Sequence, residues 1–268
     1  MLTQERFNTI LNLLEEKGAV TVQELSEVLG TSESTVRRDL NTLNEQGKLE
    51  KVHGGATLKK SDDGFVNIED DFVTKSHLHS QEKENIAKYA ASLIKDDDFV
   101  YLDAGTTTEK LIKYLPENIK ATFVTNGIVH AKSLVRKGLR AFVIGGELKL
   151  ITEAIIGVTA IEELNRYNFS KCFLGTNGIS KANGFTTPDI DEAMIKNKAH
   201  EKSYVTYILA DHSKFNRVFS VSFGEMSNSC IITDKLTDNS YKDLAVIKEV
   251  DGWFTQLPLT LQLTMLLS

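Results

Sequence analysis

The chain has 268 residues, more than one typical domain, so one small and one larger folded unit are expected. Hydrophobic residues make up 41% and charged residues 25%, which is ordinary for folded proteins and excludes a chain that is disordered throughout. The formal net charge of −6 excludes a protein that binds polyanions over its whole surface. A nucleic-acid site would therefore have to be small and local.

The cysteines and the N-terminus indicate the cellular compartment of the protein. Cys172 and Cys230 lie far apart in apolar runs and form no C-x-x-C motif, so we expect reduced core residues. The N-terminus lacks the basic and then apolar pattern of a signal peptide, and no run reaches the roughly 18 apolar residues that a membrane span needs. The expectation is a cytoplasmic protein with no membrane partner.

Two short amphipathic helices are predicted before residue 31. Apolar residues recur at helical spacing from Phe7 to Leu14, which indicates the first helix. Thr21 and Glu24 have the spacing of a capping box and begin a second helix, which Gly30 ends. Tight turns separate these segments.

A third helix is predicted from Ser32 to Gly47, with Val36, Leu40 and Leu43 on its inner face. Residues 48–58 then form two apolar stretches around a Gly-Gly pair, which predicts a β-hairpin and hence a winged helix-turn-helix. In this geometry the second helix of the motif enters the major groove of DNA, where arginine bonds guanine. The DNA-binding side chains predicted in this way are Ser34, Thr35, Arg37, Arg38, Asn41, Lys51 and His53.

A pair of arginines on its own is most often an ordinary solvated helix face. Residues 1–57 hold six basic and nine acidic residues, yet Arg37, Arg38, Lys48, Lys51 and His53 gather on the third helix and the hairpin. This clustering favours a partner of double-stranded DNA over the solvated face. Residues 1–57 are thus the predicted DNA-binding domain.

The same segment resembles a known family. The run Thr-Val-Arg-Arg-Asp-Leu at 35–40, followed by Gly-Lys-Leu at 47–49 and Val-His-Gly-Gly-Ala at 52–56, is similar to the N-terminal signature of the DeoR family of bacterial transcriptional regulators. The resemblance implies a C-terminal sensor domain for phosphorylated sugars.

Residues 58–79 are polar and aperiodic and are predicted to be a linker. His77 and His79 would share a face of an extended segment, but no cysteine or third histidine lies near them in the sequence, so no metal site is predicted.

Residues 80–250 are predicted to form an α/β domain. From residue 99, short apolar runs end in small polar residues and are followed by helical patterns, five times in succession. Such alternation indicates a mostly parallel sheet covered by helices, and ligands bind beyond the carboxyl ends of strands in such sheets. The polar clusters all follow strands.

The clusters suggest a site for a phosphorylated sugar. Gly105 and three threonines begin a helix, where N–H groups and the helix dipole favour phosphate, although a plain helix cap is an equal alternative. Asp103 is assigned to sugar hydroxyls or to orienting the loop, the asparagines to hydroxyls, and Lys214 to phosphate, although a lone lysine is more often a solvated surface residue. The predicted effector-binding residues are Asp103, Gly105, Thr106, Thr107, Thr108, Asn126, Asn177, Gly178, Thr187, Glu192, Asp211 and Lys214.

Residues 80–240 also resemble the sensor half of DeoR regulators, at Asp-Ala-Gly-Thr-Thr-Thr (103–108), Gly-Thr-Asn-Gly-Ile-Ser (175–180) and Asp-His-Ser-Lys-Phe (211–215). The resemblance implies a fold similar to ribose-5-phosphate isomerase and sugar-phosphate deaminases, so an enzyme is the alternative. Isomerisation needs a carboxylate that moves a proton, but the fourth strand ends in Gly-Thr-Asn-Gly. We therefore expect no enzyme, no catalytic residues and no cofactor.

The run Gly-Phe-Thr-Thr-Pro-Asp at 184–189 resembles the fructose-operon repressors of the family, which implies fructose 1-phosphate as the inducer. Lactose-operon repressors, which sense tagatose 6-phosphate, have the same architecture. Glu192 and Lys196 follow at helical spacing, and a plain surface ion pair is the alternative to a site role.

The resemblance implies a repressor that a phosphorylated sugar releases from its operator, although an activator or a constitutive DNA-binding protein would have the same motifs. Two operator half-sites imply at least a homodimer. Residues 251–268 form an apolar tail without the polar ending expected of the family; it could be an edge strand, an oligomer contact or an ending with no counterpart in the family.

Overall fold

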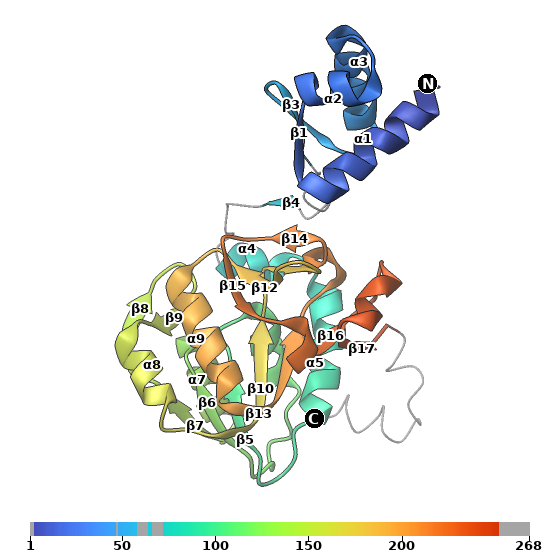
Figure 1. The fold of residues 1–268 in the computed structure, drawn as a ribbon. Helices are drawn as coiled ribbons and strands as arrows, with labels where there is room; N and C mark the ends of the chain where they lie inside the picture. Colours follow the sequence, from blue (N-terminus) through green and yellow to red (C-terminus); the bar gives the residue numbers. More distant parts are fainter. Residues whose placement is uncertain (1–2, 47, 58–63, 66–71, 252–268) are drawn as a thin grey trace. The chain divides into compact units, whose positions relative to one another are not determined.

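The structure is a computed structural model that describes residues 3–46, 48–57, 64–65 and 72–251. The chain divides into two compact units, Met1–Asp63 and Gly64–Ser268, here called the N-terminal and C-terminal units (Figure 1). Except for Asp251, the predicted apolar tail lies outside the described residues. In the described ranges no helix is both long and apolar enough to cross a bilayer.

The N-terminal unit is a winged helix-turn-helix, as predicted. Its helices are α1 (Thr3–Lys17), α2 (Val22–Leu29) and α3 (Glu33–Glu45), and its strands are β1 (Ala19–Thr21), β2 (Glu50–Val52) and β3 (Gly55–Thr57). The strands form an antiparallel sheet in the order β1-β3-β2. Helices and sheet enclose one core, which includes Ile10, Leu14, Leu25, Val36, Leu40 and Leu43.

The predicted caps set the ends of α2 and α3. The hydroxyl of Thr21 accepts a hydrogen bond from the N–H of Glu24 at 3.1 Å, and that of Ser32 accepts one from the N–H of Thr35 at 3.3 Å. Gly30 ends α2 in the left-handed conformation with φ 59°. Because each cap satisfies a backbone group that the helix leaves open, these short helices have defined ends.

Strand β1 was absent from the sequence prediction because its three residues stand between a glycine turn and a helix cap, too short for any periodicity. It pairs with β3, and Gly55 makes this pairing possible. A Cβ atom at Gly55 would stand 2.2 Å from the carbonyl oxygen of Val20, closer than any side chain tolerates. The glycine pair of the hairpin thus serves the sheet as well as the turn.

The C-terminal unit is built on a seven-stranded sheet in the order β17-β16-β13-β10-β5-β6-β7, in which every neighbouring pair is parallel. The strands are β5 (Phe99–Leu102), β6 (Thr122–Thr125), β7 (Arg140–Val143), β10 (Phe169–Gly175), β13 (Ser203–Leu209), β16 (Cys230–Thr233) and β17 (Val246–Glu249). The predicted mostly parallel α/β fold is therefore confirmed.

Two of these strands were missed by the sequence prediction, which relied on alternation with helices. β16 follows another strand rather than a helix, and only the 3₁₀ segment Asn239–Asp243 separates it from β17. A search for apolar runs that are each followed by a helical pattern could therefore not detect β16 and β17.

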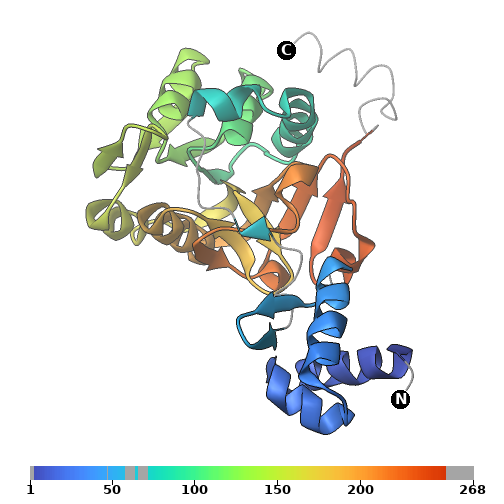
Figure 2. The same ribbon diagram turned by 90° about the horizontal axis from the view of Figure 1, so that it is seen from above.

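Helices cover both faces of the sheet (Figure 2). One apolar core joins the sheet to α5 (Ser80–Ser92), α6 (Thr106–Lys113) and α7 (Ile128–Arg136). A second core on the other face joins it to α8 (Val158–Leu164) and α9 (Ile190–Glu201). With both faces covered, the strands read as continuous apolar runs, which is why the sequence revealed five of them.

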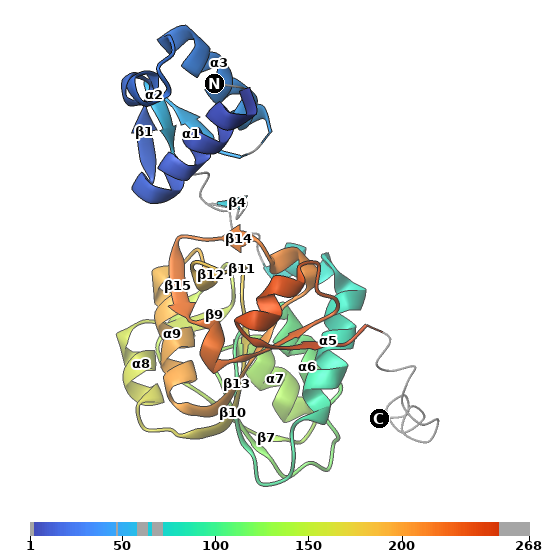
Figure 3. The same ribbon diagram turned by 45° about the vertical axis from the view of Figure 1, so that its right-hand side comes forward.

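Smaller elements surround the ends of the sheet (Figure 3). β11 (Gly178–Ser180), β12 (Gly184–Thr187) and β15 (Val221–Gly224) form one antiparallel sheet, and β8 (Glu147–Lys149) with β9 (Ala154–Ile156) forms a hairpin. A short parallel pair joins β4 (Gly64–Phe65) to β14 (Arg217–Val218).

The predicted linker, 58–79, is partly structured. Residues 58–63 and 66–71 lie outside the described residues, but β4 and a helix, α4 (Phe72–His77), belong to the C-terminal unit. The helix has six residues, fewer than two turns, so it leaves no apolar periodicity in the sequence. His77 ends this helix and does not lie in an extended segment with His79, as the sequence analysis had assumed.

Candidate functional site

The polar face of α3 carries the predicted DNA-binding side chains. Ser34, Arg37, Arg38 and Asn41 are exposed. A guanidinium N–H of Arg37 donates to Glu33 at 3.0 Å, one turn earlier on the same exposed face. Arg38 makes no side-chain hydrogen bond or ion pair with any residue in the described ranges. Of the two arginines, Arg38 is thus the more available for a partner.

Thr35 lies at the edge of this face and is half-buried. Its hydroxyl lies 3.0 Å from that of Ser32, and its N–H binds the same cap. Thr35 is thereby part of the helix cap, and its predicted contact with DNA remains a prediction.

Asp39, in the middle of the Arg-Arg-Asp signature, has a structural partner that the sequence analysis missed. Its carboxylate accepts two hydrogen bonds from the guanidinium of Arg6, at 2.7 and 3.0 Å, and both side chains are largely buried. This bidentate pair ties α1 to α3. Because the two residues are 33 positions apart in the sequence, no local pattern could predict their pairing.

The wing is attached to α3 by polar contacts. The Nζ of Lys51 donates to the side-chain oxygen of Asn41 at 2.7 Å, and the N–H of Lys51 donates to Asn44 at 2.9 Å. The exposed His53 lies at the turn of the same hairpin. The structure therefore brings Lys51 beside the exposed face of α3, and the contact of His53 with DNA remains a prediction.

A pocket in the C-terminal unit lies where β5, β10 and β13 end, as expected for a parallel sheet. The predicted effector residues that line it are Asp103, Gly105, Thr106, Thr107, Asn177, Glu192, Asp211 and Lys214. Lining residues that the prediction did not include are Phe72, Lys75, Lys83, Ala104, Thr152, Gly175, Thr176, Lys196 and Leu209.

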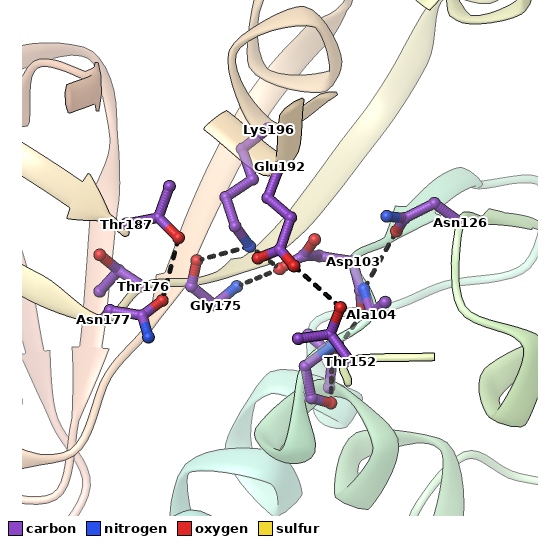
Figure 4. A network of polar contacts seen from close by, with 12 residues as sticks. Asp103, Ala104, Asn126, Thr152, Gly175, Thr176, Asn177, Thr187, Glu192 and Lys196 are labelled. Atoms are coloured by element: carbon purple, nitrogen blue, oxygen red, sulfur yellow. Dashed lines mark hydrogen bonds and ion pairs between the residues drawn. The ribbon is translucent and has the colours of Figure 1, made fainter. Parts of the chain in front are cut away.

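Asp103 and Lys196 form a buried ion pair on one wall of this pocket (Figure 4). The carboxylate of Asp103 also accepts the N–H of Gly175 at 3.0 Å, and the Nζ of Lys196 also donates to the carbonyl oxygen of Gly175 at 3.2 Å. The loops after β5 and β10 are thus joined to α9. Asp103 orients the loop, one of the two roles predicted for it, and its charge is neutralised.

Glu192 does not pair with Lys196, although the two stand one turn apart on α9. Its carboxylate accepts a hydrogen bond from the hydroxyl of Thr152 at 2.8 Å (Figure 4). It accepts another from the Nζ of Lys149, also at 2.8 Å. The alternative of a plain surface ion pair between Glu192 and Lys196 is therefore wrong, because each side chain is turned into the pocket wall toward a different partner.

Four predicted effector residues do not line the pocket. The side chain of Asn126 is buried and accepts the N–H of Ala104 at 3.0 Å, so it supports the loop between β5 and α6 and does not line the pocket. The fully buried hydroxyl of Thr108 bonds to the carbonyl oxygens of Asp103 and Gly105.

Thr187 and Gly178 also lie outside the pocket lining and support residues that form its wall. The hydroxyl of Thr187 donates to the side-chain oxygen of Asn177 at 3.1 Å, which orients that amide. A Cβ at Gly178 would stand 2.4 Å from the carbonyl oxygen of Arg217. Both residues shape the wall without reaching the space inside.

Four lysines and three carboxylates line the pocket. Lys83 lies in the first turn of α5, is buried, and donates to the carbonyl oxygen of Lys75. Burial, with help from the nearby charge of Lys214, lowers the pKa of Lys83 to about 8. Burial acts to raise the pKa of Asp211, but the charge of Lys214 and hydrogen bonds from Ser213 hold it below its usual value.

The lysines of α4 and α5 gave no usable signal in the sequence. Lys83 stands in a polar stretch at the start of a helix, where a solvated lysine is the ordinary expectation. Only the packing of α5 against the sheet carries its side chain inward. Lys75 was not considered as a pocket residue because residues 58–79, which include its helix, were predicted to be a linker.

Two groups among the described residues could hold a metal ion: His79, Asp211 and His212, and Glu82, His212 and Asp234. The sequence analysis found no partner for His79 because Asp211 and His212 lie more than a hundred residues further along the chain. The end of β13 brings them together.

Family models match both units. A model described as the DeoR-like helix-turn-helix domain matches residues 6–62, and one described as the DeoR C terminal sensor domain matches residues 78–235.

Several relatives match over nearly the whole chain. A protein of Bacillus subtilis (strain 168), described as an uncharacterized HTH-type transcriptional regulator FruR, is 42% identical and covers 93% of this chain and 99% of its own length. A lactose phosphotransferase system repressor of Staphylococcus aureus (strain NCTC 8325 / PS 47) is 34% identical, with the same coverage of each chain.

Among solved structures, ribose 5-phosphate isomerase A of Methanocaldococcus jannaschii aligns with a TM-score of 0.39 and 15% identity, over 51% of this chain and 54% of that one. A likeness at this level carries no functional argument. The functional argument comes from the two family models and the relatives, which are transcriptional regulators, and they rule out the alternative of an isomerase or deaminase. The chain belongs to the DeoR family of transcriptional regulators, whose members are not enzymes.

Proposed function

We propose that this protein represses a sugar-utilisation operon and leaves its operator when a phosphorylated sugar occupies the pocket of the C-terminal unit. The observation that carries the proposal is that buried Lys83 and half-buried Lys214 line the same pocket as the first turn of α6, at the carboxyl ends of the strands. Such a place suits an anion with hydroxyl groups, which is what a sugar phosphate is.

The phosphate is assigned to the α6 side of the pocket. The first turn of a helix has N–H groups without acceptors inside the helix, and here it begins at Thr106 beside Gly105. Lys83 and Lys214 line the same pocket, lie near each other, and bring positive charge. Because Lys196 neutralises Asp103, that carboxylate does not oppose the phosphate.

The sugar hydroxyls are assigned to other polar groups that line the pocket. These are Asn177, Thr176 and Thr152, together with the carboxylate of Glu192. Thr187 holds the side-chain oxygen of Asn177, so the amide nitrogen has its two donors for hydroxyl oxygens. Asn126 has no part in this assignment because both ends of its amide bond the backbone.

Fructose 1-phosphate is the effector that we favour. The Gly-Phe-Thr-Thr-Pro-Asp run forms β12 and the cap of α9, so it positions Glu192 in the pocket and Thr187 behind Asn177. The name of the Bacillus subtilis relative supports the same choice. Tagatose 6-phosphate is the alternative, which the lactose phosphotransferase system repressor supports.

The DNA contact is assigned to the exposed face of α3 with the wing, and the active form to a homodimer or a higher homo-oligomer. A helix-turn-helix reads about half of a two-fold operator, so two copies are needed for both half-sites. The sugar can release the operator only if it binds the DNA-incompetent arrangement more tightly, with a typical coupling of about 1 to 3 kcal/mol.

The test is operator binding across a panel of sugar phosphates. The purified protein first selects a DNA duplex from random sequence, and fluorescence anisotropy then measures its affinity for that duplex with fructose 1-phosphate, fructose 6-phosphate, tagatose 6-phosphate or glucose 6-phosphate. We expect release by fructose 1-phosphate at the lowest concentration. Lowest-concentration release by tagatose 6-phosphate would establish the alternative, and no release by any of them would refute the sensor assignment.

A further inference from the structure

Two histidines and a carboxylate converge beside the pocket. One ligand atom each from His79, Asp211 and His212 lie within 4.8 Å of one another, and the rings of the two histidines meet edge to face with centroids 5.3 Å apart. Asp211 is almost fully buried and the histidines are half-buried. This cluster has no part in the sugar and DNA assignments, except that Asp211 also lines the pocket.

Different parts of the fold supply the cluster. His79 stands at the residue before α5, in the left-handed conformation with φ 50°, and Asp211 and His212 follow β13. The residues are thus held by the packing of α5 against the sheet.

Asp234 orients one of the two rings. Its carboxylate accepts hydrogen bonds from the N–H of His212 at 2.7 Å and from Nδ1 of the ring at 2.6 Å. With Nδ1 donating to a carboxylate, Nε2 is the nitrogen that the ring has for another ligand. Metal-binding histidines usually have such a carboxylate behind them, because it fixes the ring and raises its basicity.

We propose that His79, Asp211 and His212 form a binding site for a divalent transition-metal ion, with Zn²⁺ as the ion that fits best. Two imidazoles and one carboxylate are a common donor set for zinc, and the fourth position would be open to water. Donor atoms of a tetrahedral site lie roughly 3.3 Å apart, given zinc–nitrogen bonds of about 2.0 Å, so the three side chains would draw slightly closer around the ion.

The surrounding charges both oppose and support the ion. Lys83 and Lys214 interact with Asp211 and compete for its charge. Asp234 supplies a second negative charge behind His212, so the two carboxylates together balance a divalent cation. The metal would join α5 to the end of β13 at the wall of the sugar pocket.

The test uses the full-length chain without a histidine tag, stripped of metal by a chelator and returned to chelator-free buffer. Isothermal titration with Zn²⁺ measures affinity, and elemental analysis after dialysis counts bound zinc. We expect about one ion per chain, and Asp234→Asn to bind about 10- to 100-fold more weakly because its role is to orient His212. His79→Ala and His212→Ala should lose at least as much.

His77→Ala is the matched control, because His77 is exposed and lies two residues from His79 yet is absent from the cluster, and it should bind zinc like the wild type. Circular dichroism checks that each variant is folded. If a variant unfolds, the visible spectrum of Co²⁺ bound to the wild type reports directly on nitrogen and oxygen ligands. Failure of the wild type to retain zinc, or equal zinc affinity in the His79, His212 and His77 variants, would overturn the proposal. Neither result bears on sugar release, which is measured separately.

Discussion

The ammonium group of Lys196 and the carboxylate of Asp103 form a buried ion pair that joins α9 to the loop after β5. Removal of one partner leaves the other charge buried without compensation, which typically costs about 3 to 5 kcal/mol. We therefore predict that Lys196→Met lowers the free energy of unfolding of the C-terminal unit by that amount. Urea denaturation followed by circular dichroism measures it.

Lys198→Met is the matched control on the same helix. Lys198 pairs with Glu201 on the surface, so its loss should cost no more than about 0.5 kcal/mol. The double variant Asp103→Asn with Lys196→Met should recover most of the stability, because it removes both charges. A cost for Lys196→Met as small as that of the control would show that the pair is not buried in solution.

Replacement of the α3 arginines should weaken operator binding. Arg38→Ala is expected to cost about 1 to 3 kcal/mol, with altered base preference if Arg38 contacts a base, and a uniform loss if it contacts phosphate. Arg37→Ala should cost less, because Glu33 already pairs with Arg37. Anisotropy with the selected duplex and its single-base variants distinguishes these results. Arg166→Ala, an exposed arginine of the C-terminal unit, is the control that should bind as wild type; equal affinity in all three would exclude α3 as the recognition helix.

Loss of either lysine that we assign to the phosphate should separate sensing from DNA binding. Lys214→Ala and Lys83→Met should keep wild-type operator affinity but need about 10- to 100-fold more sugar phosphate for release, the usual worth of one charged hydrogen bond. Lys120→Ala, an exposed lysine of the same unit, should release normally. If Lys214→Ala and Lys83→Met also release at the wild-type sugar concentration, the phosphate lies elsewhere.

The pKa of Lys83 makes sugar binding depend on pH. In the free protein Lys83 loses its proton near pH 8, whereas a bound phosphate dianion would hold the proton on. The affinity for sugar phosphate should therefore be full below pH 8 and fall by up to about tenfold per pH unit above it. Titration calorimetry between pH 7 and 9 measures the slope, which should vanish in Lys83→Met. An equal slope in that variant would assign the titration to another group.

Buried His130 predicts a loss of stability in mild acid. Burial lowers the pKa of His130 to about 4, while its ring nitrogen Nε2 lies within hydrogen-bond distance of the carbonyl oxygen of Gly105 and the hydroxyl of Thr108. An unfolded histidine has a pKa of about 6.5, so the stabilisation is full above pH 6.5 and decreases as pH falls toward 4, by about 3 kcal/mol in total. Urea denaturation at pH 7.5 and pH 5 should show this decrease, and His130→Gln should show much less of it.

Local signals predicted the N-terminal unit well. Caps such as Thr21 and Ser32, and the apolar spacing on α3, lie within a few residues of the structure that they create, so the sequence contains the whole signal. The ion pair of Arg6 and Asp39 left no such local signal in the sequence, because its two residues come from different helices. The signature aspartate therefore looked like one more surface charge.

The pocket was predictable in position but not in detail. The rule that ligands bind beyond the strand ends located Asp103, Gly105 and Lys214. It could not tell that Asn126 faces the backbone, or that Lys83 turns inward, because both depend on how helices pack against the sheet. Side-chain direction, rather than residue type, separates ligands from supports.

The two units need different lengths of chain before they can fold during synthesis, because the parallel sheet of the C-terminal unit joins segments far apart in the sequence. The core of the N-terminal unit is complete once residue 57 has left the ribosome, whereas the pocket needs segments from Lys75 to Lys214. Because N-terminal domains generally fold first as the chain emerges, a nascent or truncated chain acquires its DNA-binding fold before it can sense any sugar. Nonsense mutations in the later half of the gene should therefore leave fragments that keep the winged helix but ignore the inducer.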